Sequence, residues 1–203
     1  MKFEELNTRL ENTLAESGLE GYSPRQEKLI KLSKQGKNQL ISTPYDQEIV
    51  DALHFISFMR APEMLEGSPR VLWITPTWES AREKVKSFRN LMKRSDVTIE
   101  IADDKGKIIE QRNAIFEGAE ILIGNPKRLL EIYNQNGFHI NQLSLVIIDH
   151  AEILCRNPLT LQAIRRIAES LPKCQKLIFS EGTHERLEPF CEDICTFYET
   201  SDL

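Results

Sequence analysis

Short apolar runs alternate with helix-like patterns along most of this 203-residue sequence, and this alternation restricts the fold more than any other feature. The runs expected to form strands cover residues 39–42, 71–75, 98–101, 121–124, 145–149, 176–180 and 196–199. Helical spacing of apolar residues is expected near 47–60, 78–94, 107–117, 126–135, 159–170 and 184–194. Strands and helices that alternate in this way predict βαβ units, and therefore a three-layer α/β fold with a mainly parallel central sheet.

Two further helices are expected before the first strand. Apolar residues at near-helical spacing predict a helix over 3–16. Pro24 predicts the start of a second helix, which is expected to end near Gly36. A chain of 203 residues suits one domain with a sizeable core, so 1–203 is expected to be a single domain in which 1–36 forms a helical lead-in.

Charge and cysteine content narrow the classes of function. The net charge of −5 argues against non-specific binding to phosphate backbones, although it is compatible with a local basic surface. The sequence shows neither an apolar leader nor a run near the ~18 apolar residues of a membrane span, which predicts a cytoplasmic protein. The four cysteines are spaced irregularly and are expected to be reduced, mostly buried thiols. A metal site that combines them with His150 and His184 is the less favoured alternative.

The apolar run 145–148 ends abruptly in Asp149, which is followed by His150. A buried parallel strand of this kind delivers the next side chain to the carboxyl edge of the sheet, where α/β folds bind ligands. In P-loop ATPases a carboxylate in this position holds Mg²⁺. Asp149 is therefore a candidate metal ligand, and the favoured alternative is an exposed carboxylate that makes only local hydrogen bonds.

Five short motifs occur in order along the chain, at residues 18–26, 76–81, 125–129, 149–152 and 180–182. In this order and spacing the sequence resembles the N-terminal RecA-like domain of DEAD-box RNA helicases. The segments resemble the Q motif, motif Ia, motif Ib, the name-giving tetrapeptide and the Ser-Ala-Thr motif. Pro24 and Gln26 match the first of these, and only Ser180 matches the last. Together they imply a RecA-like fold over nearly the whole chain.

The resemblance also implies positions that would face a nucleotide, and several carry the wrong residue. These positions are Gln26, Thr43, Asp46, Glu48, Ile49 and Val50. Gln26 would contact adenine. In the phosphate loop that begins at Thr43, Ile49 replaces the phosphate lysine and Val50 replaces the Mg²⁺ hydroxyl. Asp46 and Glu48 stand in place of glycines, so two carboxylates would repel a triphosphate.

No ATP or Mg²⁺ cofactor and no catalytic residue are therefore expected. Asp149 is interpreted as a vestigial Mg²⁺ ligand. His150 can in principle act as a base near neutral pH, but it is interpreted as a side chain that caps the end of the strand.

Motifs Ia and Ib contact RNA phosphates in the family, which makes their surroundings a candidate RNA-binding surface. The helix after motif Ia carries a basic stripe beside an apolar one. The candidate RNA-binding residues are Thr77, Trp78, Arg82, Lys86, Arg89, Lys127 and Arg128. Cations on phosphates and an indole on a base would suit single-stranded RNA. The alternative is an ordinary solvated helix face.

Three functional hypotheses follow. Only residues 181–203 follow Ser180, so the second RecA-like domain of the family, with its arginine finger, is expected to be absent. The leading hypothesis is a non-catalytic module that binds RNA or a protein partner. The second is a residual nucleotide-dependent enzyme that uses Gln26 and Asp149 and is completed by another polypeptide. The third is an unrelated hydrolase built on Ser180 and His184.

Overall fold

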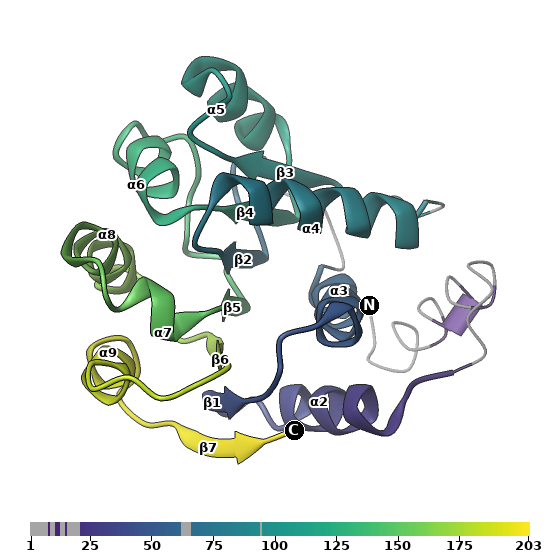
Figure 1. Cartoon of the computed structure of the whole chain (residues 1–203). Helices are drawn as coiled ribbons and strands as arrows, with labels where there is room; N and C mark the ends of the chain where they lie inside the picture. The colour runs from purple at the N-terminus through teal and green to yellow at the C-terminus, as the bar shows by residue number, and fades with distance from the viewer. Residues whose placement is uncertain (1–7, 9–10, 13–14, 16–20, 62–65, 94) are drawn as a thin grey trace.

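A seven-stranded parallel sheet forms the middle layer of the protein (Figure 1). The computed structural model describes residues 8, 11–12, 15, 21–61, 66–93 and 95–203. The strands are β1 (Gln39–Ser42), β2 (Val71–Ile74), β3 (Ile99–Ala102), β4 (Ile121–Gly124), β5 (Leu145–Ile148), β6 (Gln175–Ser180) and β7 (Glu199–Asp202). They lie in the order β3-β4-β2-β5-β6-β1-β7, and every neighbouring pair is parallel. The α/β fold predicted from the sequence is confirmed.

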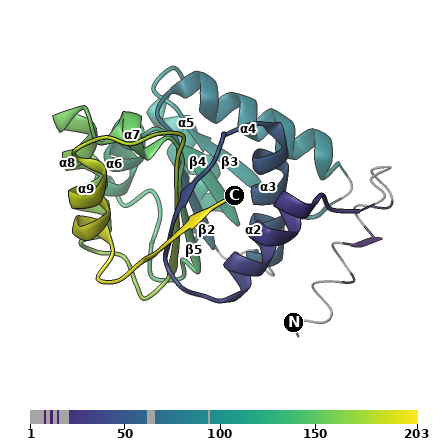
Figure 2. The ribbon, with the colours of Figure 1, turned by 60° about the horizontal axis from the view of Figure 1, so that its bottom comes forward.

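Helices cover both faces of the sheet (Figure 2). One face carries α2 (Pro24–Lys34), α3 (Gln47–Arg60) and α4 (Trp78–Leu91), and the other carries α6 (Pro126–Asn134), α8 (Pro158–Ala168) and α9 (Leu187–Ile194). Helix α5 (Ile108–Glu117) packs against β3 and α6, and the one-turn α7 (Ala151–Leu154) follows β5. Within the described ranges, no helix combines the length and the apolar character that crossing a bilayer needs.

Each central strand sends alternate side chains into two separate apolar cores. In β2, Val71 and Trp73 pack beneath α2, α3 and α4, whereas Leu72 and Ile74 pack against the helices of the opposite face. Because both faces are buried, β2 and β5 contain only apolar residues. This arrangement explains the continuous apolar runs in the sequence. Trp73 is fully buried in the first of these cores.

Capping side chains fix where several helices begin. Ser23 and Gln26 form a capping box at the start of α2, with a proline in its first turn. Asp46, Thr77 and Asn125 cap α3, α4 and α6, each by accepting a hydrogen bond from the amide three residues further on. These four helices start where the sequence predicted, because each cap is formed by residues next to the helix start, which can be recognised in the sequence.

Other elements differ from the sequence predictions. The last strand covers Glu199–Asp202 rather than 196–199, because pairing with β1 begins only at Glu199, and the Asn38 side chain bonds the Phe197 carbonyl just before it. Helix α7 was not expected at all. The helix predicted from residue 184 starts at Leu187. The helix predicted over 3–16 lies largely outside the described residues.

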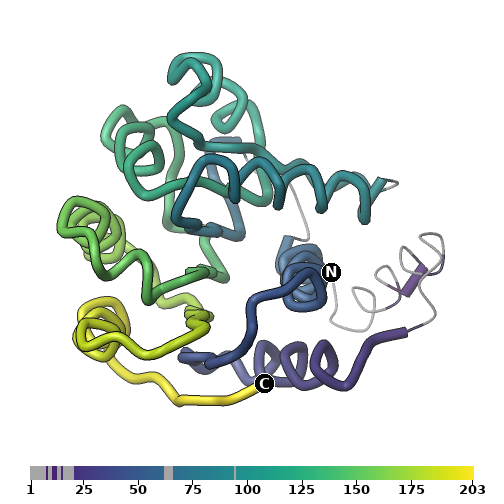
Figure 3. The backbone as a smooth tube through the Cα atoms, in the orientation of Figure 1, coloured from purple at the N-terminus to yellow at the C-terminus, as the bar shows by residue number. Residues whose placement is uncertain are grey.

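The carboxyl ends of the parallel strands meet along one edge of the sheet. Thr43 and Asp149 follow β1 and β5, and Ser180 ends β6, which lies between those two strands. Figure 3 follows the chain from β1 into α3 and shows the C-terminal end of the chain close to α2. Lys28 of α2 donates a hydrogen bond to the Asp202 carbonyl at 2.6 Å, which ties these two segments together. The candidate site is built at this edge.

Candidate functional site

Asp149 is fully buried at the carboxyl end of β5 and is held by three donors. Its Oδ2 lies 2.8 Å from Nζ of Lys84, 3.2 Å from the hydroxyl of Tyr45 and 3.3 Å from Nε1 of Trp73. The expectation of an exposed carboxylate was therefore wrong. The strand delivers Asp149 beneath the loop after β1, and a lysine from a neighbouring helix neutralises it there.

Lys84 comes from α4 and was not expected in this site. Its side chain is 7% exposed, donates to Ser80 Oγ at 2.6 Å, and lies over the rings of Tyr45 and Trp73. In the sequence it stands three residues after Ala81 and four before Phe88, so it shares their buried helix face. Its spacing from Ala81 and Phe88 was the signal in the sequence that could have identified it as buried.

Tyr45 covers the Asp149–Lys84 pair from the loop after β1. Its ring packs 5.7 Å from that of Phe179 and 4.7 Å from that of His150. Burial and the adjacent Asp149 carboxylate raise the pKa of the Tyr45 hydroxyl well above its usual value. The hydroxyl therefore stays protonated and keeps donating to Asp149.

Two carboxylates of the protein occupy backbone donors of the same loop. Asp46 caps α3 and accepts from the Ile49 amide at 3.2 Å, and Glu181 accepts from the Tyr45 amide at 2.7 Å. Backbone N–H groups at the start of such a helix are the donors that cradle phosphates in P-loop proteins. Ile49 itself is buried in the core beneath α3, and Val50 packs against the same core.

Arg25 holds this loop in place, and sequence reasoning missed it because it lies outside the loop. Its guanidinium donates to Asp46 at 2.7 Å and Glu48 at 3.0 Å, and also to Thr43 Oγ1 and the Pro44 carbonyl, both at 2.8 Å. Burial alone would raise the pKa of Asp46, but the hydrogen bonds from Arg25 and the Ile49 amide bring it below its usual value. Asp46 and Glu48 are thus both ion-paired with Arg25 within the protein.

The amide group of Gln26 is also engaged within the chain. Its Oε1 accepts from the Ser23 amide at 3.0 Å, and its Nε2 donates to the Glu48 carbonyl at 3.2 Å. The Ser23 hydroxyl in turn donates to the Glu48 carboxylate. Gln26 therefore braces the start of α2 against the start of α3.

His150 joins the candidate site through an unusual backbone conformation. Its φ of 48° and ψ of 49° are left-handed, and its side chain forms no capping hydrogen bond at the start of α7. His150 lies just beyond the end of β5, and its interpretation as a strand-end residue without a catalytic role stays a prediction. Its Nδ1 lies 3.5 Å from Oε1 of the buried Glu152, and this hydrogen bond is the main cause that raises the His150 pKa.

The residues around motifs Ia and Ib are only partly available as a surface. Arg128 is buried and donates to the Gly106 carbonyl and to Gln111 Oε1, so its assignment to an RNA-binding surface was wrong. Arg82 pairs with the buried Asp103 at 2.6 Å.

The other candidate cations and Thr77 have mixed roles. Thr77 caps α4, and Arg89 donates to the Ile99 carbonyl, whereas Lys86 and Lys127 are exposed. Trp78 is half-buried. The guanidinium of Arg82 lies 4.9 Å from the centre of its ring, and Nζ of Lys105 lies 5.5 Å from it.

The family of this chain follows from a comparison over most of its length. The DEAD/DEAH box helicase family model matches residues 23–186. The chain belongs to the DEAD/DEAH box helicase family. It is 28% identical to the DEAD-box ATP-dependent RNA helicase CshA of Streptococcus pneumoniae over 186 residues, which cover 89% of this chain and 34% of CshA. It is 30% identical to the ATP-dependent RNA helicase RhlB of Vibrio atlanticus over 102 residues, 48% of this chain and 23% of RhlB. The chain spans about a third of the length of CshA.

Solved structures of DEAD-box proteins share the fold of this domain. A hypothetical ATP-dependent RNA helicase from Sulfolobus tokodaii superposes with a TM-score of 0.82 at 22% identity, over 97% of this chain and 57% of the other. The S. cerevisiae protein dbp5 (l327v), bound to gle1 h337r and ip6, gives a TM-score of 0.84 at 18% identity, over 100% of this chain and 52% of the other. The predicted RecA-like fold is confirmed.

The last motif segment of this DEAD-box domain does not bring Ser180 and His184 together as a catalytic pair. Ser180 Oγ donates to the Gly182 carbonyl, while His184 Nδ1 lies 3.7 Å from Cys155 Sγ. The hydrolase hypothesis therefore lacks its geometry. All four cysteines are free, and burial raises the pKa of the Cys191 thiol to about 12. In the part of the chain that the structure describes, no group of three His, Cys, Asp or Glu side chains is arranged to hold a metal ion.

Proposed function

We propose that this DEAD-box domain is a non-catalytic binding module that does not take Mg-ATP in the pose of a P-loop ATPase. The observation that carries the proposal is the buried pair of Asp149 and Lys84, covered by Tyr45. A lysine nitrogen 2.8 Å from the carboxylate repels a divalent cation that approaches the same group. Oδ1 of Asp149 has no partner among the described residues, but it is buried and belongs to the same neutralised carboxylate.

The loop after β1 supports the same proposal, because its backbone donors are not free to bind a phosphate. The amides of Ile49 and Tyr45 already donate to carboxylates of the chain, which a phosphate would have to displace. No lysine extends from the start of α3, because the corresponding position is the buried Ile49. The residues present therefore do not fit a Mg²⁺-bound triphosphate, and we assign no hydrolytic step to them.

Calorimetric titration of the domain with Mg-ATP and with Mg-ADP tests this proposal. We expect no saturable heat with either nucleotide at concentrations up to the millimolar range. The matching third of CshA, titrated under the same conditions, is the reference for a relative named as an ATP-dependent helicase. Saturable binding of Mg-ATP to this domain in the micromolar range would overturn the proposal and favour a residual nucleotide-dependent enzyme.

A second candidate function, binding of single-stranded RNA, is favoured by the surroundings of Trp78. Its ring is flanked by the cations of Arg82 and Lys105, and Lys86 of the same helix and Lys127 of α6 are exposed. An aromatic ring with nearby cations is the usual platform for an unpaired base and its phosphates. The ion pair of Arg82 with Asp103 and the exposed Glu79 reduce the positive potential of this surface.

Fluorescence anisotropy with a labelled oligouridine tests RNA binding. We expect the affinity to fall steeply with salt, and Trp78→Ala and Lys127→Glu to weaken it by roughly tenfold. Lys31→Glu, a reversal at a side chain that is 75% exposed on α2, serves as the charge control and is expected to have little effect. Equal losses in Lys127→Glu and Lys31→Glu would remove this surface as the RNA site and leave only non-specific attraction.

A further inference from the structure

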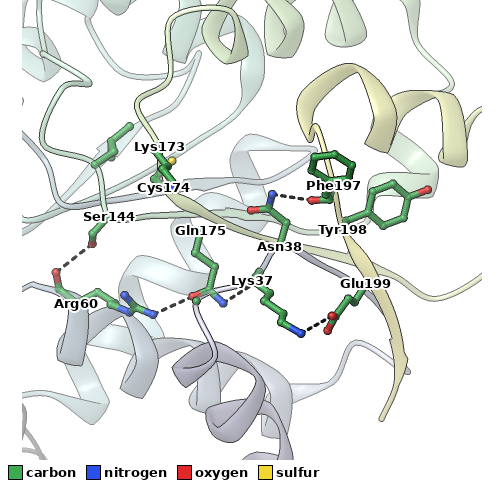
Figure 4. Close-up of a pocket in the computed structure, with 12 residues that line it drawn as sticks. Lys37, Asn38, Arg60, Ser144, Lys173, Cys174, Gln175, Phe197, Tyr198 and Glu199 are labelled. Atoms are coloured by element: carbon green, nitrogen blue, oxygen red, sulfur yellow. Dashed lines mark hydrogen bonds and ion pairs between the residues drawn. The ribbon is translucent and has the colours of Figure 1, made fainter.

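A groove of about 760 Å³ lies at the amino ends of β1, β5 and β6, opposite the edge that carries Asp149 (Figure 4). Loops that are far apart in the sequence meet there. Its walls include Lys37, Arg60, Lys173, Cys174, Phe197 and Glu199. Asn38 holds the walls together, since its side chain donates to the Phe197 carbonyl at 2.8 Å and accepts from the Lys176 amide at 2.9 Å.

Phe197 is the most exposed large apolar side chain among the described residues, at 82% exposure. It lines this groove and also a second one of about 730 Å³. The second groove is apolar at Leu171 and Ile194 and carries both charges, Lys176 with Glu192 and Asp193, so the basic character belongs to the first groove. A single exposed phenylalanine is not unusual by itself. Here the ring lies where two grooves meet, so a ligand that covers it and fills both must be extended.

The first groove is basic, although the protein as a whole is acidic. Lys37, Arg60 and Lys173 line it against one carboxylate, Glu199, while the whole chain has a net charge of −5. Arg60 is fixed by hydrogen bonds to the Ser33 carbonyl and to Gln175 Oε1. Lys37 pairs with Glu199 at 2.5 Å, but both side chains are at least half exposed. Such surface pairs are worth little, so a ligand carboxylate can exchange with Glu199.

Lys173 adds an available cation to this wall. It is exposed, and among the described residues its ammonium has no hydrogen-bond or ion-pair partner. A ligand that is complementary to this surface carries negative charge for Lys37 and Lys173 and an apolar group for the Phe197 ring.

We propose that these two grooves bind an acidic, extended peptide segment of a partner protein. An apolar side chain of the peptide packs on Phe197, and its carboxylates pair with Lys37 and Lys173. Aromatic residues in such positions carry much of the binding energy of an interface, and rim charges mainly speed association and set its salt dependence. The inference does not depend on nucleotide binding, because the grooves lie at the opposite edge of the sheet from Asp149.

Selection of random displayed twelve-residue peptides against the intact domain tests the proposal, followed by anisotropy with the enriched peptides. We expect acidic sequences with one aromatic or large aliphatic residue. Phe197→Ser and Lys173→Glu are expected to weaken them by roughly tenfold or more. Two matched variants at distant sites, Leu159→Ser at a side chain that is 76% exposed and Lys107→Glu at one that is 81% exposed, are expected to leave the affinity unchanged.

Other results would overturn the proposal. Enriched peptides that are neutral or basic, or that bind the Phe197→Ser variant equally well, would exclude an acidic peptide at this site, as would failure to enrich any peptide. Sedimentation that shows a wild-type dimer and a Phe197→Ser monomer would identify a second copy of the chain as the occupant instead. Oligouridine binding that is lost in Lys173→Glu would assign the groove to RNA.

Discussion

Replacing Lys84 with methionine is expected to destabilise the domain by about 3–5 kcal/mol, because it leaves the Asp149 carboxylate buried without its counter-ion. Asp149 is fully buried and the Lys84 side chain is 7% exposed, so water cannot compensate for the lost charge. Methionine keeps the apolar stem of the side chain, which separates the charge effect from a packing effect. In a domain of this size the change corresponds to a drop in melting temperature of roughly 6–20 °C.

A double-mutant cycle isolates the pair itself. Asp149→Asn alone leaves the Lys84 ammonium buried and unpaired, whereas the amide still accepts from Tyr45 and Trp73. Combining it with Lys84→Met removes both charges. We therefore expect the double variant to be more stable than the sum of the single effects predicts, by roughly 2 kcal/mol or more. Urea unfolding followed by the fluorescence of Trp73 and Trp78 measures all four proteins.

The reasoning behind this prediction would be refuted by either of two results. One is a cost of Lys84→Met below about 1 kcal/mol, the typical worth of an exposed ion pair. The other is strict additivity of the two substitutions, which would mean that Lys84 and Asp149 do not interact in solution.

Three further predictions concern the loop and two histidines. Arg25→Ala is expected to cost about 1.5–3 kcal/mol in urea unfolding, since it removes charged hydrogen bonds, and a neutral effect would contradict its bracing role. His54 is fully buried in α3, and this burial, with Lys84 nearby, lowers its pKa to about 3. Stability is therefore expected to fall as the pH drops from about 6.5 toward that value, by up to about 1.4 kcal/mol per pH unit. His54→Leu is expected to reduce this loss of stability at acid pH. An unchanged dependence of the unfolding free energy on pH would refute the role given to His54. The Glu152 hydrogen bond raises the His150 pKa, so the protonated imidazole stabilises the fold at acid pH. His150→Ala is therefore expected to lower the unfolding free energy more at pH 5.5 than at pH 8.5. A larger loss at pH 8.5 would refute this role of the hydrogen bond.

The fold could be predicted because the sheet is buried on both faces. Strands such as Ile121–Gly124 and Leu145–Ile148 are continuous apolar runs, and turn and capping residues separate them from the helices. The edge strand Glu199–Asp202 carries no apolar residue, so periodicity gave it no signal. Its register depends instead on pairing with β1, which is a tertiary contact.

The candidate site was predicted in position but not in chemistry. Motif order assigned Asp149 and the loop after β1 to one edge of the sheet, and the structure brings them together there. Sequence could not assign partners that come from other segments of the chain. Lys84 reaches Asp149 from a helix that reads as surface, and Arg25 neutralises two carboxylates that were expected to face a phosphate. Both misses come from treating charged residues as solvated when they pair inside the fold.

The indole N–H of Trp73 offers the most direct test of whether this site is closed to Mg-ATP. It donates to Asp149 Oδ2 at 3.3 Å, so its cross-peak in a ¹H–¹⁵N spectrum responds to any cation or phosphate that reaches the carboxylate. The indole of Trp78, which is half-buried on a different surface, is the internal control. During titration with Mg-ATP we predict a Trp73 cross-peak that stays in place. A saturable shift of the Trp73 signal alone would contradict the account.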